Sequence, residues 1–337
     1  MKTPIPVLVL FGPTASGKTG ILFELFNLLN AHETSLQKAM QAEIISADSM
    51  QVYKGMDIGT AKPSAEERAR LPHHLIDICD PSQQFNAGDF VRLADTACMQ
   101  ITQRGKLPVV SGGTGFYLKN FILGLSEAPP SNLEIRGQLQ KELNVKGSKL
   151  LMDELTACDP VSAQRIHIND EYRLLRALEV YRSSGMPLSS YENSSTETRG
   201  NFSFITIGLS RPRAELYRRI NLRCEEMFRL GLHEEVQALF KAGYTPEDPG
   251  LRAIGYREFF IEPYVSKETY EDNAPRWDIS KDLRGVQALI AQNSRRYAKR
   301  QITFFAGIPD VKWIEIDGSE KIIAQRIREI LNKEQFF

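Results

Sequence analysis

The segment from Gly12 to Thr19 constrains the fold of this chain more than any other. Its sequence, GPTASGKT, fits the phosphate-binding pattern G-x-x-x-x-G-K-[ST]. The apolar run Ile5–Phe11 before it predicts a buried strand, and the residues from Ile21 onward predict a helix. In that context the loop amides and the helix N-terminus converge on phosphate oxygens. The motif therefore predicts an oligophosphate site, with Lys18 on the outer phosphate and Thr19 as a magnesium ligand.

Short apolar runs recur along the chain and alternate with helical patterns. They predict strands over residues 5–11, 43–47, 74–79, 107–111, 202–210 and 311–316. This alternation favours an α/β fold with a doubly wound parallel sheet, of the P-loop NTPase-like kind. Later segments over residues 213–242 and 283–305 predict further helices.

The alternation is interrupted between residues 126 and 201. Three helices are predicted there, over residues 133–143, 150–157 and 170–183, and no strand. We therefore expect a core built from residues 1–125 and 202–337, with an all-helical insertion domain over residues 126–201.

Composition narrows the class of protein. The chain has 337 residues, of which 42% are hydrophobic and 25% charged, as is ordinary for a globular protein. No apolar run approaches the ~18 residues that a membrane span needs, and no signal peptide is visible. Four cysteines without C-x-x-C spacing predict reduced thiols in a cytoplasmic protein and argue against zinc. The net charge is zero, so overall basicity gives no evidence for nucleic-acid binding, although a local basic surface is compatible with it.

Two more segments follow predicted strands. Asp48 comes directly after the strand over residues 43–47, and the turn Gly112–Gly115 (GGTG) follows the strand over residues 107–111. Open α/β sheets bind ligands at the carboxyl ends of their strands. By position alone, Asp48 can hold magnesium, act as a base or cap a helix. The glycine turn fits either a structural role or a close approach to a ligand.

Taken in order, these motifs resemble those of one family. GPTASGKT at 12–19, ADSMQVYKGMDIGTAKPS at 47–64, PHHLIDICDP at 72–81 and SGGTGFYL at 111–118 resemble the bacterial tRNA dimethylallyltransferases, or tRNA isopentenyltransferases. The helical segment that carries Arg219, Arg223 and Met227 and the segment AIGYRE at 253–258 also resemble that family. The resemblance spans roughly residues 7–305. Ile168 departs from it, because proline is usual at that position.

The resemblance implies a reaction. Members of the family transfer a dimethylallyl group from dimethylallyl diphosphate to N6 of adenosine 37, beside the anticodon of tRNAs that read codons starting with U. Pyrophosphate leaves. The phosphate loop would then bind the diphosphate of an isoprenoid, although the motif alone equally suggests ATP. The implied partners are the tRNA anticodon stem-loop and dimethylallyl diphosphate, the implied cofactor is Mg²⁺, and we expect a monomer.

The resemblance also implies roles for individual residues. Asp48 would be the general base, and Lys18, Thr114 and Arg223 would share the catalytic work. The expected diphosphate contacts are Gly12, Pro13, Thr14, Ala15, Ser16, Gly17, Lys18, Thr19 and Arg223. The expected tRNA contacts are Asp48, Ser49, Met50, Gln51, Thr114, Arg136, Gln164, Arg165, Ile166, His167, Ile168, Arg252, Ala253, Ile254, Gly255, Tyr256, Arg257, Arg295, Arg296 and Lys299. Tyr297 would be available to stack on a base.

Three alternatives remain at this point. An adenylate dimethylallyltransferase, which modifies free AMP, ADP or ATP, shares the phosphate loop and the aspartate. It has less need for the helical insertion or for Arg252–Arg257. A small-molecule or nucleotide kinase would hold ATP in the same loop. A nucleotide-binding module without enzymatic activity is the third.

Overall fold

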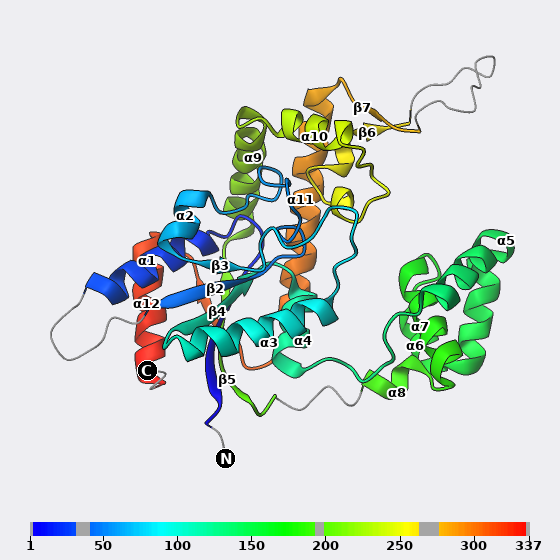
Figure 1. Cartoon of the computed structure of the whole chain (residues 1–337), viewed down its shortest axis with the longest axis horizontal. Coiled ribbons are helices and arrows are strands. Elements are labelled where there is room, and N and C mark those ends of the chain that lie inside the picture. The colour runs from blue at the N-terminus through cyan, green and yellow to red at the C-terminus, as the bar shows by residue number, and fades with distance from the viewer. Residues whose placement is uncertain (1–2, 32–40, 193–198, 263–275, 335–337) are drawn as a thin grey trace. The chain divides into compact units, whose positions relative to one another are not determined.

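Six parallel strands form the central sheet of the computed structural model, which describes residues 3–31, 41–192, 199–262 and 276–334 (Figure 1). The strand order is β3-β2-β4-β1-β5-β8, and every neighbouring pair is parallel. The strands are β1 (Ile5–Phe11), β2 (Ala42–Ala47), β3 (His73–His74), β4 (Leu107–Gly112), β5 (Phe202–Ser210) and β8 (Lys312–Glu315). The predicted parallel α/β sheet is confirmed.

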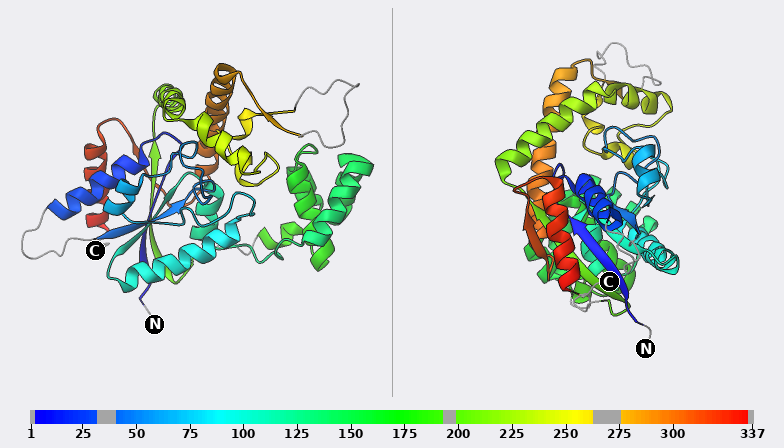
Figure 2. Two further views of the ribbon diagram at one scale, coloured as in Figure 1. Left: turned by 45° about the horizontal axis from the view of Figure 1, so that its top comes forward. Right: turned by 90° about the vertical axis from the view of Figure 1, so that its left-hand side faces the viewer.

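Helices cover both faces of this sheet. On one face, α1 (Lys18–Ala31) and α12 (Glu320–Lys333) pack together and bury Ile21, Leu25 and Ile327 against strand residues such as Leu10. On the other face, α3 (Ala87–Gln103) packs against β1, β2 and β4 (Figures 1 and 2). Two-sided coverage explains why the central strands consist almost entirely of buried residues.

The remaining elements of this unit surround one end of the sheet. They are α2 (Ala65–Arg70), α4 (Gly115–Leu123), α9 (Arg213–Arg229), α10 (Leu232–Lys241) and α11 (Leu283–Phe305), with short 3-10 turns at Gly250–Arg252 and Arg257–Phe259. A small antiparallel pair joins β6 (Phe260–Ile261) to β7 (Asp278–Ile279).

Strand register brings the predicted motifs together. The phosphate loop follows β1, Asp48 follows β2 and the glycine turn follows β4, and these three strands are neighbours in the sheet. Gly112 is paired with Phe11 of β1 and with Ala47 of β2. A Cβ atom at Gly112 would lie 2.1 Å from the carbonyl oxygen of Ala47. Only glycine allows this approach, so the close packing of the strand ends depends on it.

A separate compact unit spans Asn120–Arg199, whereas the sequence predicted an insertion over residues 126–201. Its helices are α5 (Leu133–Cys158), α6 (Pro160–Arg165), α7 (Glu171–Ser184) and α8 (Leu188–Glu192). Leu139, Leu155 and Leu178 are among the residues that form its own core. Gly147 has a left-handed φ of 75° inside α5, which divides it into the two helices that the sequence predicted.

One prediction of secondary structure was wrong. The strand predicted over residues 74–79 ends at His74, because Leu75 and Asp77 have left-handed backbones with φ of 62° and 57°. The helical region predicted over residues 213–242 is confirmed, and it consists of two helices, because Gly231 has φ of 98° and turns the chain between α9 and α10. Within the described ranges, no helix is both long and apolar enough to cross a membrane.

Glu179 is a buried anion in the separate unit. It has no exposed surface, accepts hydrogen bonds from Ser131 Oγ (2.7 Å) and the Asn132 amide (2.5 Å), and pairs with Arg136 (3.1 Å) and Arg176 (3.3 Å). Burial acts to raise the pKa of this carboxyl, but the hydrogen bonds and Arg176 outweigh burial, and the pKa lies below its usual range.

Replacing Glu179 should loosen the unit to which it belongs. We expect Glu179→Ala to cost about 3–5 kcal/mol, because two arginines lose their buried partner. The loss of stability should appear as faster hydrogen exchange of the backbone amides of α5 and α7. The difference from wild type should shrink as pH falls below the usual range of a glutamate carboxyl and through the lowered pKa of Glu179, where the wild-type carboxylate itself takes up a proton. The exposed Asp153 on α5 provides the control, Asp153→Ala. Equal exchange in both variants would contradict the structural role.

Candidate active site

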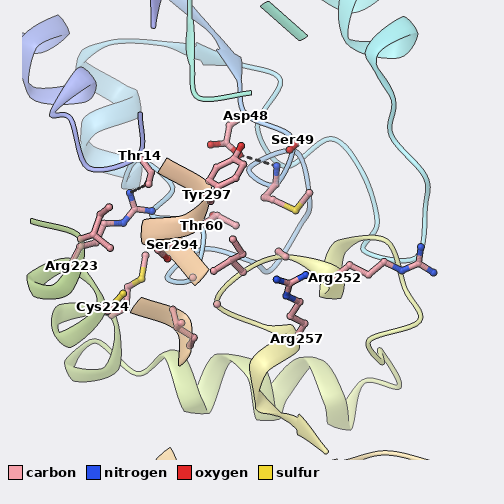
Figure 3. A pocket seen from close by; sticks show the side chains of 18 of the residues that line it. Thr14, Asp48, Ser49, Thr60, Arg223, Cys224, Arg252, Arg257, Ser294 and Tyr297 are labelled. Atoms are coloured by element: carbon pink, nitrogen blue, oxygen red, sulfur yellow. Dashed lines mark hydrogen bonds between the residues drawn. The ribbon is translucent and has the colours of Figure 1, made fainter. Parts of the chain in front are cut away.

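A cavity of about 280 Å³ lies at the carboxyl end of the sheet (Figure 3). The phosphate loop contributes Thr14 to its wall, and the residues after β2 contribute Asp48. Arg223 of α9, Tyr297 of α11 and Arg257 are among the other polar residues that line it. Figure 3 shows Arg223 bonded to Thr14. Segments that are far apart in the sequence therefore form one cavity.

The phosphate loop has the backbone that its motif requires. Ala15 and Gly17 have left-handed φ values of 61° and 100°. Lys18 bends back over the loop and donates from Nζ to the carbonyl oxygens of Gly12 (2.9 Å) and Pro13 (3.0 Å). Burial lowers the pKa of the Lys18 ammonium to about 8; nearby Asp48 raises it and Arg223 lowers it further. The loop therefore concentrates positive potential where a phosphate group would bind.

Three arginines support this loop from outside. Arg219 donates to the carbonyl of Ala15 (2.9 Å), Arg211 donates to the carbonyl of Ser16 (3.2 Å), and Arg223 donates to the Thr14 hydroxyl (3.1 Å). Arg219 and Arg223 are four residues apart on α9 and share a face. That spacing could have identified Arg219 from the sequence, whereas Arg211 follows β5 and has no local signal.

One buried polar atom of the loop lacks a partner. The side chain of Ser16 has no exposed surface, and within the described residues its Oγ makes no hydrogen bond. Buried hydroxyls are usually satisfied, so an unpaired one in a phosphate loop is consistent with a ligand that completes the site.

Asp48 caps the turn that follows β2. Its Oδ1 accepts from the amides of Met50 (2.9 Å) and Gln51 (3.4 Å). Within the described part of the chain Oδ2 accepts no hydrogen bond, so the cap leaves one oxygen for chemistry. Thr114 lies alongside, because its hydroxyl accepts from the Ser49 amide (2.9 Å). Two of the predicted catalytic residues are thus held next to each other.

Tyr297 lies inside the cavity wall. Burial and the Asp48 carboxylate raise the pKa of its phenol to about 12, against hydrogen bonds with Thr114 and Gln301 that lower it. The guanidinium of Arg300 lies 5.7 Å from the centre of its ring. The sequence suggested Tyr297 only as a stacking surface and did not predict that it lies near Asp48.

A carboxylate that the sequence did not single out organises the opposite wall. Glu235 of α10 accepts from the amides of Asp57 (2.9 Å), Ile58 (2.8 Å) and Gly59 (3.2 Å) and from the Tyr256 hydroxyl (2.7 Å). The Tyr256 side chain is fully buried against Gly59, where a Cβ atom would lie 2.4 Å from the ring. Tyr256 can therefore act on tRNA only through the loop that it supports.

The remaining residues predicted to contact tRNA occupy three surfaces. Arg252 and Arg257 are exposed at the cavity, where Ala253, Ile254 and Gly255 also line the wall. On α11, Arg296 and Lys299 are exposed, whereas Arg295 donates to Asn221 (2.6 Å).

The third surface belongs to the Asn120–Arg199 unit. Arg136 pairs with Glu179 and lies 4.6 Å from the centre of the Tyr172 ring, so part of its role is structural. At the end of α6, the exposed residues are Gln164, Arg165, His167 and Ile168, while Ile166 packs against the core of the unit.

A family model described as IPP transferase matches residues 51–307, which is more than half of the chain. The chain belongs to the IPP transferase family. A tRNA dimethylallyltransferase of Citrifermentans bemidjiense is 42% identical over 327 residues, which is 97% of each chain.

Solved structures support the same assignment. The tRNA isopentenylpyrophosphate transferase of Bacillus halodurans is 35% identical with a TM-score of 0.63, and the similarity covers 98% of both chains. A eukaryotic dimethylallyltransferase acting on tRNA gives a TM-score of 0.75 at 26% identity, over 98% of this chain and 79% of that one. These similarities confirm the predicted fold class and the predicted family.

The low pKa of Lys18 predicts how this member of the IPP transferase family binds diphosphate. As pH rises through about 8, Lys18 in the free protein loses its proton and its attraction for an anion. We expect the Kd for inorganic pyrophosphate to rise by about tenfold per pH unit above that value. Isothermal titration calorimetry between pH 7 and 9.5 measures it.

Lys18→Met provides the control, because it keeps every other titrating group, including those of pyrophosphate. Its binding should be weaker at pH 7 and should lack the additional loss at high pH. The same pH dependence in both proteins would show that Lys18 does not carry the charge that binds diphosphate.

Proposed function

We propose that this chain is a tRNA dimethylallyltransferase, which transfers a dimethylallyl group from dimethylallyl diphosphate to N6 of adenosine 37 in tRNAs that read codons starting with U. One observation carries the proposal: the phosphate loop, Asp48 and Thr114 meet at the ends of three neighbouring strands, around one cavity. The relative from Citrifermentans bemidjiense, similar over its whole length, bears the same activity in its name.

The donor side supports departure of pyrophosphate. When the C–O bond of the allylic diphosphate breaks, its electron pair goes to the diphosphate and the carbon gains cationic character. Lys18, the loop amides and Arg223, which is bonded to the Thr14 hydroxyl of the loop, would stabilise this negative charge. Such preorganised donors are each worth about 2.7–4 kcal/mol of barrier.

The residues of this site fit an Mg²⁺ ion that binds together with the diphosphate. Thr19 lies exposed at the start of α1, and the Ser16 hydroxyl is buried without a partner. Magnesium commonly takes few protein ligands and completes its shell with substrate phosphates and water. When bound, it would neutralise charge on the diphosphate, and Thr19 is the residue that would hold it.

The acceptor side supports proton removal. The N6 amine of adenine is a weak nucleophile, because its lone pair is conjugated with the ring. As N6 forms its bond to the allylic carbon, its proton would pass to the Asp48 carboxylate. General base assistance of this kind is worth roughly 10²–10⁴-fold in rate. Thr114 holds the backbone of Ser49, next to Asp48, and so orients the base.

The tRNA would reach the cavity with its adenosine turned out of the anticodon loop. Unstacking a base costs a few kcal/mol, so a gripping surface is needed. Arg252, Arg257, Arg296 and Lys299 are exposed basic candidates, and the Asn120–Arg199 unit offers Arg165 and His167. We further propose a monomer in the cytoplasm, where its four cysteines would stay reduced.

A labelling experiment separates this function from its alternatives. Purified protein is offered radiolabelled dimethylallyl diphosphate with unmodified tRNA, with AMP, or with AMP and tRNA together, and [γ-³²P]ATP with candidate acceptors in a parallel reaction. We expect label in tRNA alone. Label in AMP but not in tRNA would establish an adenylate dimethylallyltransferase, and transfer of the γ-phosphate would establish a kinase.

Asp48 should be needed for turnover and not for binding. We expect Asp48→Asn to lower kcat by roughly 10²–10⁴-fold, because the amide cannot accept the proton. The carboxamide oxygen still accepts from Met50 and Gln51, so the turn and the Kd for tRNA should stay near wild type. Single-turnover transfer and filter binding measure the two effects. Near-normal turnover would remove Asp48 as the base.

Exposed cations on α11 should contribute electrostatic contacts to tRNA. We expect Arg296→Gln to weaken tRNA binding and to reduce the slope of log K against log[salt] by about 1. Arg328→Gln on α12 is the control, because it removes the same charge from a half-buried position on a helix that does not line the cavity. Identical slopes for both variants and wild type would exclude Arg296 from the tRNA surface.

A further inference from the structure

Gln301 of α11 is a buried amide that links two loops. Its side chain is 4% exposed. Its Oε1 accepts from the Thr14 amide of the phosphate loop (2.8 Å), and its Nε2 donates to the Gly113 carbonyl of the glycine turn (2.7 Å). These partners are 287 and 188 residues away in the sequence. One side chain therefore joins the loops that follow β1 and β4.

Each of the two loops leads to one reactant. Thr14 also accepts from Arg223, on the side where the diphosphate would bind. Gly113 precedes Thr114, which holds the Ser49 amide next to Asp48, on the side of the base. Tyr297, one helical turn before Gln301, lines the same cavity as Asp48 (Figure 3). The face of α11 that carries these two residues thus lies between donor and acceptor machinery.

Packing alone does not account for an amide at this position. A buried amide without partners destabilises the folded protein, whereas an apolar side chain of similar length would carry no such cost. Here both polar atoms are used, and both partners are backbone groups of loops that line or border the cavity. The fit is also tight, because a Cβ atom at Gly113 would lie 2.6 Å from Gln301 Nε2.

We infer that Gln301 is a positioning residue for the transfer reaction, which sets the distance between the diphosphate-binding loop and the loop that orients Asp48. The inference rests on the proposed function. Gln301 touches neither reactant. It acts through the Thr14 amide and the Gly113 carbonyl, and each loop keeps its own binding groups without it.

A distinct kinetic signature follows from this arrangement. Loss of the link leaves the affinity for each reactant unchanged, because Lys18, Arg223 and the basic surface are intact. The reacting carbon and the N6 atom are then misaligned, and a misplacement of about 1 Å can cost on the order of 10² in rate. The effect therefore appears in kcat and not in KM.

Two substitutions by side chains about as long as glutamine test the positioning role of Gln301. Gln301→Met removes both hydrogen bonds, and Gln301→Glu keeps an acceptor for Thr14 but loses the donor to Gly113. We expect single-turnover transfer to tRNA to fall about 10–100-fold in each. The Kd for tRNA in both variants, and the Kd for pyrophosphate in the uncharged Gln301→Met, should stay within about twofold of wild type, as measured on the folded protein. Gln292→Met and Gln292→Glu, on the exposed face of α11, serve as matched controls.

Gly113→Ala perturbs the same link from its other end, and it serves if a Gln301 variant fails to fold. Its rate should fall similarly, and the double variant with Gln301→Met should lose no more than the worse single variant. Wild-type kcat in folded Gln301→Met, or an equal loss of reactant affinity, would overturn the inference. Wild-type protein that fails to label tRNA would instead overturn the proposed function.

Discussion

The close pairing of β2, β4 and β1 at Gly112 is the constraint on which the site depends. Three strand ends can bring three loops to one place only if their backbones approach within contact distance, and a side chain at Gly112 would collide with the Ala47 carbonyl. The phosphate loop, the Asp48 turn and the GGTG turn consequently begin at a common level. Helices α9 and α11 then supply Arg223, Tyr297 and Gln301 over that edge.

Charge is arranged asymmetrically around this edge. The phosphate loop is surrounded by cations that bond to its carbonyls or hydroxyl, with Arg219 and Arg211 outside it and Lys18 within. Burial lowers the pKa of both Lys18 and Arg223, and the charge of the Asp48 carboxylate opposes this lowering in each. The anion of the base and the cations of the diphosphate site therefore stabilise each other before any reactant binds.

The sequence predicted most of the sheet and the family, because short apolar runs and glycine loops carry local signals. The strand at Phe202–Ser210 was predicted with its observed bounds. The sequence could not predict the early end of β3, because that end depends on left-handed φ at the non-glycine residues Leu75 and Asp77. Neither Gln301 nor Glu235 has a local signal: each looks like an ordinary polar residue of a helix, and its role arises only from partners distant in the chain.

The hydrogen bonds from Lys18 to Gly12 and Pro13 also bear on what happens between turnovers. A loop with a left-handed alanine carries backbone strain that its surroundings must hold in place. The Lys18 ammonium helps to do so by binding two carbonyl oxygens of the loop from within. An incoming diphosphate, which binds N–H groups and cations, therefore meets a loop that is already shaped.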